Sequence, residues 1–277
     1  MKLFAITLEA AIKRPFAFLA TAFMTLIFLY VNSYNPLLGL LMGFTQITGG
    51  DALQSILSVL QVLSDADIVY PILAIFLIGG VLISVFFGAL ISGVFFILNN
   101  YLEGKNKVKN EFILGVKKNF KKVVFITFKS ILVIAAAACF LLIACVPSIV
   151  ITKAAAPNKE NLFAIAILLN TVTLFVLFFM VMFIKIYISF WYAAAFSTSE
   201  KYFISGKKAA DMNFWNNFLV YMLFDFVFVF VQYILWLIRK SPAAFFINWV
   251  FISLFLFAYA MYVLSTYKKA AAKTAKK

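Results

Sequence analysis

The chain has 277 residues, of which 65% are hydrophobic and 12% are charged, against roughly 25% charged residues in an ordinary soluble domain. Such a composition cannot cover a surface with polar groups, so it excludes a soluble enzyme. The formal net charge is +14, but the basic residues stand at the ends of apolar runs and not in one basic domain, which argues against a nucleic-acid partner. Histidine is absent from the sequence, which excludes histidine-based general base chemistry and histidine metal ligation.

Apolar runs predict the membrane-spanning helices. A spanning helix needs about 20 apolar residues, because roughly 30 Å of hydrocarbon is crossed at about 1.5 Å per residue. In chain order, the predicted spans cover residues 16–31, 68–99, 123–151, 162–190, 214–237 and 245–266. The sequence therefore predicts an all-α fold: a polytopic membrane helix bundle of about six spans that forms one integral membrane domain over residues 1–277.

The segment between the first two predicted spans contains an amphipathic pattern at about 51–64. Asp51 can cap a helix, and leucine and isoleucine follow at helical spacing, with glutamine and serine on the remaining surface. Two placements fit this outer helix. It can lie on the outer membrane–water interface, or it can pack over the outer ends of the bundle.

The distribution of basic residues predicts the orientation. Segments on one side of the predicted spans, which include both termini, hold 18 lysines and arginines, and the opposite segments hold 4. By the positive-inside rule, both termini are cytoplasmic and the protein belongs to the plasma or inner cell membrane.

The inner segments at 103–122 and 197–213 mix lysines with apolar residues. Membrane lipids are the expected partners, with anionic headgroups attracted to these loops at about 1 kcal/mol per basic residue. The alternative is that the lysines only determine topology.

Similar sequences precede three of the spans. AAIKRPF, LGVKKNF and KAADMNF end at Phe16, Phe120 and Phe214, and each is followed by two predicted spans. The pattern predicts three repeated two-helix units in parallel orientation. The alternative is that a basic segment followed by an aromatic residue is common at any cytoplasmic boundary.

The second span carries a stripe of small residues. Gly80, Ser84, Gly88 and Ser92 are each four residues apart and therefore share one helix face. Such a face allows close approach of a neighbouring helix, which helix association in lipid requires. Static packing is the expected role, and a sliding or gating surface is the alternative.

Three ionisable residues lie deep within predicted spans: Lys129, Lys185 and Asp225. A lysine can extend its ammonium group to the headgroups, but the shorter aspartate cannot. We therefore expect an interhelical ion pair of Asp225 with Lys129 or Lys185, and the sequence does not choose between them. The alternative is a neutral aspartic acid that is hydrogen-bonded to a neighbouring span.

The stretches at 119–132 (NFKKVVFITFKSIL) and 190–235, with its NFW helix entry at 213–215, resemble a broad prokaryotic group of six-helix membrane proteins. This group is similar to the membrane domain found beside glycerophosphoryl diester phosphodiesterases. The resemblance implies a fold and no activity, and it carries over no functional residues.

No sequence motif indicates catalysis. Neither GxxxxGK[ST] nor GxSxG occurs, and Cys139 and Cys145 are too far apart for a CxxC pair and are expected to be packing residues. The sequence favours a non-enzymatic membrane or assembly factor without cofactor or metal. A transporter or permease subunit is the alternative.

Overall fold

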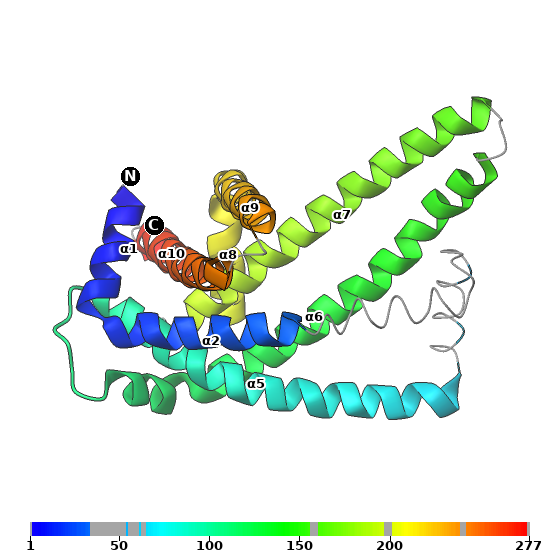
Figure 1. Cartoon of the computed structure of the whole chain (residues 1–277). Helices are drawn as coiled ribbons and strands as arrows, with labels where there is room; N and C mark the ends of the chain where they lie inside the picture. Colours follow the sequence, from blue (N-terminus) through cyan, green and yellow to red (C-terminus); the bar gives the residue numbers. More distant parts are fainter. Residues whose placement is uncertain are drawn as a thin grey trace. The chain divides into compact units, whose positions relative to one another are not determined.

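The computed structural model describes residues 2–33, 65–155, 160–196, 201–238 and 242–275, together with positions 54 and 61. Every element within these residues is an α-helix (Figure 1), which confirms the predicted all-α fold. The outer helix predicted at 51–64 lies outside the described residues except for Gln54 and Gln61.

The helices follow the predicted spans closely. They are α1 (Lys2–Lys13), α2 (Pro15–Ser33), α5 (Ala66–Leu102), α6 (Glu111–Ala155), α7 (Glu160–Ala195), α8 (Tyr202–Met212), α9 (Phe214–Leu237) and α10 (Pro242–Ala275). Of these, α5, α6, α7, α9 and α10 are each long and apolar enough to cross a membrane. The pair α1–α2, bent by 102°, supplies a sixth span if it is counted as one.

Helix α6 begins at Glu111, 12 residues before the predicted span. The segment at 111–122, expected as an inner connection, is helical because it is amphipathic. Glu111, Gly115, Asn119 and Val123 are buried at a spacing of four, and lysines occupy exposed positions between them. Hydropathy detects only the apolar part of this helix.

Each of the three repeated entry segments overlaps a helix. Helix α1 has 12 residues and α8 has 11, and the first three turns of α6 occupy the matching place. The chain breaks between helices at Arg14 and at Asn213, whereas it continues as one helix through Phe120. Pro15 accounts for the first break, because proline is compatible with a helix start but not with a helix interior. The three-unit repeat stays a prediction.

The chain forms two compact units. The first comprises residues 1–30, 83–128 and 185–277, and the second comprises residues 31–82 and 129–184. In the first unit, α1 packs against α10, and α8 packs against α9 and α10. Val123, Ile126 and Ala195 form a buried hydrophobic cluster in this unit.

In the second unit, polar side chains of α6 and α7 form hydrogen bonds with one another. The Ser148 hydroxyl donates to Asn170 Oδ1, and Asn170 Nδ2 donates to Thr152 Oγ1 over 3.1 Å. Polar groups in a membrane span are costly unless they have such partners, so these bonds link α6 with α7.

Candidate functional site

Asp225 and Lys185 form an ion pair between α9 and α7 in the first unit. The Lys185 ammonium group donates to Asp225 Oδ1. The lysine side chain is 29% exposed and the aspartate side chain 42% exposed. The pair gives each charge a partner within a span, where an isolated charge is expensive.

Two tyrosine rings complete the surroundings of Lys185. Its Nζ lies 5.4 Å from the ring centroid of Tyr259 and 5.8 Å from that of Tyr221, both within the range of a cation–π interaction. One turn further along α7, Ser189 Oγ lies 2.7 Å from the hydroxyl of Tyr259. The ammonium group is thus held by one carboxylate and two aromatic faces.

Helix α9 presents a polar row towards this cluster. Asn217, Tyr221 and Asp225 are spaced by four residues and share one helix face. Asn217 and Tyr221 are fully buried. The Tyr262 hydroxyl donates to Asn217 Oδ1 over 3.2 Å, and Asn217 Nδ2 has no hydrogen-bond partner within the described ranges. The row leads from the first turn of α9 to the ion pair.

Of the two predicted partners of Asp225, Lys185 is the lysine whose ammonium group contacts its carboxylate in the structure.

The small-residue stripe of α5 is buried. Ser84 and Ser92 have no exposed surface, and Gly80 and Gly88 are also buried. In the first unit, Gly88 faces Val124 of α6: an added Cβ would lie 2.6 Å from Val124 Cγ2 and 3.1 Å from Val124 Cα. The Ser92 hydroxyl donates to the carbonyl of Gly88, so its hydrogen-bond partner lies within α5 itself. Gly88 therefore allows the backbones of α5 and α6 to approach closely.

A second polar cluster joins the α1–α2 bend to the start of α6. Arg14 Nη1 lies 2.7 Å from Glu111 Oε2, and the two side chains are only 5% and 6% exposed. Arg14 Nη2 also donates to the carbonyl of Lys105 over 2.6 Å, and Asn100 Nδ2 donates to Glu111 Oε1 over 2.8 Å. This network fixes the α5–α6 connection against the bend at Arg14.

The neighbouring charges on the surface pair among themselves. Lys13 lies 2.6 Å from Glu9 one turn away, and Lys105 lies 2.6 Å from Glu103, which also contacts Lys268 at 3.2 Å. The hydrogen bond from Lys105 is the main cause that lowers the pKa of Glu103 below its ordinary value. The carboxylate of Glu103 is therefore held in the charged form.

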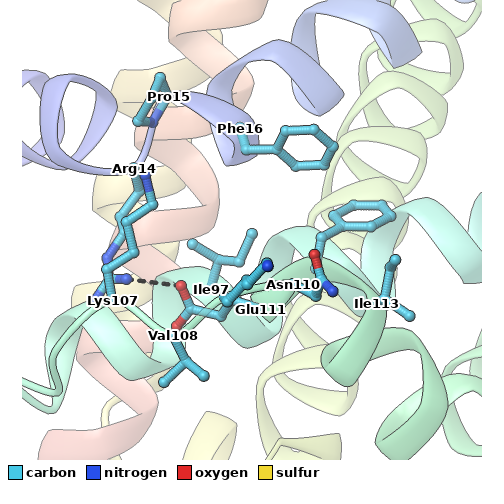
Figure 2. Close-up of a pocket in the computed structure, with 11 residues that line it drawn as sticks. Arg14, Pro15, Phe16, Ile97, Lys107, Val108, Asn110, Glu111 and Ile113 are labelled. Carbon is cyan, nitrogen blue, oxygen red and sulfur yellow. Dashed lines mark hydrogen bonds and ion pairs between the residues drawn. The ribbon is translucent and has the colours of Figure 1, made fainter.

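Two adjoining cavities flank Arg14, and Figure 2 shows the first of them. The first has a volume of about 330 Å³ and a largely apolar wall that includes Phe16, Ile97 and Val108. The second has a volume of about 430 Å³ and a mainly polar lining. Arg14 and Lys107 line both. Volumes of this size are typical of small-molecule sites.

The Arg14 network was not predicted from the sequence. In the sequence, Arg14 is one of the basic residues that predict the topology, and Glu111 lies in a lysine-rich segment. One feature of the sequence indicates it: Glu111, Gly115, Asn119 and Val123 are spaced by four residues and share one helix face. Because Val123 is apolar, this spacing predicts that the carboxylate of Glu111 lies on a buried helix face.

No family model, no curated protein and no solved structure matches the chain. The resemblance to the phosphodiesterase-associated membrane domain thus rests on the short segments quoted above. Within the described ranges, no three Cys, Asp or Glu side chains gather as a metal site would require. The fold defines the class: this is a multi-pass helical membrane protein.

Proposed function

We propose that the chain is a non-enzymatic membrane or assembly factor of the plasma or inner cell membrane. Both termini are cytoplasmic in this proposal, as the partition of 18 basic residues against 4 favours. The resemblance to the phosphodiesterase-associated membrane domain agrees with it, since that resemblance implies a fold without an activity.

The Lys185–Asp225 ion pair is the observation that carries the proposal. Each charge already has its partner within the chain, and two tyrosine rings flank the ammonium group. An ionisable pair satisfied in this way links α7 to α9 without needing a ligand. This arrangement supports a structural role for Lys185 and Asp225, the two charged residues of the pair within the spans.

A transporter or permease subunit is the second candidate, and one observation favours it. The side chain of Asp225 is 42% exposed and that of Lys185 is 29% exposed, so the pair is accessible from outside the unit that holds it. Accessible carboxylates within spans are used by proton-coupled transporters.

A flux measurement separates the two candidates. The purified chain is reconstituted into liposomes that contain a pH-sensitive dye, and a potassium diffusion potential drives protons inward. An assembly factor is expected to give the same trace as empty liposomes. A proton flux that is abolished in a folded Asp225→Asn variant would replace the proposal with the transporter.

A further inference from the structure

The apolar cavity beside Arg14 has an exposed hydrophobic wall. Val108 is 52% exposed, Ile113 is 53% exposed and Phe16 is 58% exposed. Phe16 also packs edge-on against Phe112, with ring centroids 5.3 Å apart. This wall comes from three places in the chain: the first turn of α2, Ile97 on α5, and the connection into α6 with its first turn (Figure 2).

Gly93 of α5 makes room for part of this wall. A Cβ on Gly93 would lie 2.2 Å from the ring of Phe112. Because glycine has no side chain at this point, Phe112 packs directly on α5 and stays in place beside Phe16. Phe112 thus supports the wall from the side of α5.

Lysines border the same cavity. Lys107 and Lys109 flank Val108, and both are exposed. In the part of the chain that the structure describes, neither ammonium group has a salt-bridge partner. The carboxylate that lines this cavity, Glu111, is already bound by Arg14 and Asn100. Two uncompensated positive charges thus stand beside an apolar wall.

The adjoining polar cavity shares Lys107 and Arg14 with the apolar one. Its charged groups Glu9 and Lys13 neutralise each other at 2.6 Å. A ligand with an apolar part and an anionic part can therefore place the anionic part beside Lys107 and Lys109, where the two cavities meet at Lys107, and the apolar part along the apolar wall.

The position of the cavities along the chain indicates the source of such a ligand. Phe16 stands at the start of the apolar helix α2, and the lysines precede α6. The start of an apolar helix beside a basic segment is the depth at which phospholipid headgroups lie. A molecule with an acyl chain and a phosphate is always present there.

We propose that this pair of cavities binds one anionic phospholipid. Its phosphate lies at Lys107 and Lys109, and an acyl chain contacts Phe16, Val108 and Ile113. The inference stands independently of the proposed function, because it uses neither the ion pair nor the transport assay.

Native mass spectrometry of the detergent-solubilised chain tests the proposal. Phosphatidylglycerol and phosphatidylcholine with the same acyl chains are titrated separately. We expect tighter binding of phosphatidylglycerol. The double variant Lys107→Gln/Lys109→Gln should weaken that binding by about 30-fold, since each basic residue near the surface contributes about 1 kcal/mol.

The matched control removes two charges on α6, away from the cavities. Lys117 and Lys118 are exposed and border neither cavity, so Lys117→Gln/Lys118→Gln should leave the affinity for phosphatidylglycerol within about twofold of the parent, a shift well below one power of ten. Equal losses in the two double variants would show diffuse attraction by net charge and overturn the site. Equal affinity of the parent for both lipids would also overturn it.

A further experiment distinguishes a bound lipid from a bound free phosphate. Val108→Asn removes part of the apolar wall while it leaves both lysines in place, and it should weaken phosphatidylglycerol binding. Inorganic phosphate is titrated as a competitor. If phosphate displaces the lipid and Val108→Asn leaves lipid affinity unchanged, the site binds a free phosphate group and the lipid proposal fails.

Discussion

Replacing Gly88 tests a close contact between α5 and α6 in the first unit. A methyl group at Gly88 would lie 2.6 Å from Val124 Cγ2, and 3.1 Å and 3.2 Å from the Cα and backbone nitrogen of Val124. Carbon atoms in contact normally lie about 3.5–4.0 Å apart. A different rotamer of Val124 relieves only the first of these three contacts, so α5 and α6 must separate.

The cost follows from this geometry. Overpacking of a well-packed site typically destabilises by about 1–3 kcal/mol, and we expect Gly88→Ala near the lower end of that range and Gly88→Leu near the upper end. Gly79 is the matched control, because a Cβ there meets nothing within 4 Å. Both glycines lie inside α5, so the gain in helix propensity on replacing glycine, about 1 kcal/mol, applies to both and cancels in the comparison.

The assay is unfolding by sodium dodecyl sulfate titration in mixed micelles, followed by circular dichroism. We expect Gly79→Ala to match or exceed the stability of the parent and Gly88→Ala to fall below it. Adding Val124→Ala to Gly88→Ala should restore part of the loss, since it removes Cγ2 and leaves the backbone contacts. Equal stabilities of Gly88→Ala and Gly79→Ala would refute the close approach of α5 and α6.

The remaining predictions concern the two ion pairs, measured by the same titration. Arg14→Met should destabilise the protein by about 3–5 kcal/mol, because it leaves the buried carboxylate of Glu111 without its partner. Adding Glu111→Leu to Arg14→Met should recover most of that loss. A double variant no more stable than Arg14→Met would contradict this prediction. Lys185→Met and Asp225→Asn should be non-additive by about 0.5–3 kcal/mol, near the lower end because the pair is partly exposed, and strict additivity would show that the two charges are not coupled.

The spans could be predicted from the sequence because hydropathy along one chain is a local property. Helix α9 occupies Phe214–Leu237, the predicted range, since an apolar run bounded by polar residues specifies its own ends. The first three turns of α6 precede the predicted span and could not be predicted from hydropathy, because a helix with lysines on its exposed side has low hydropathy and its burial depends on the neighbouring α5.

The two ion pairs differ in how far each can be predicted from the sequence. The position of Asp225 within an apolar run could be predicted from the sequence, and it indicated that Asp225 needs a partner. The choice of Lys185 requires knowing which helix lies beside α9. The contact between Arg14 and Glu111 joins positions 97 residues apart, and no local pattern in the sequence specifies such a pair.

The contacts between α2 and α10 have a consequence for the order of biogenesis. Thr25 Oγ1 lies 2.7 Å from Ser253 Oγ, 228 positions away, and Trp249 Nε1 donates to the carbonyl of Ala22 over 2.7 Å. When the ribosome has completed α2, Ser253 and Trp249 have not been synthesised, and the Thr25 hydroxyl has its partner in the carbonyl of Ala22 within α2. The contacts between α2 and α10 therefore form late, after α10 has been inserted, because a non-local contact requires the entropy loss of closing the long loop between its partners.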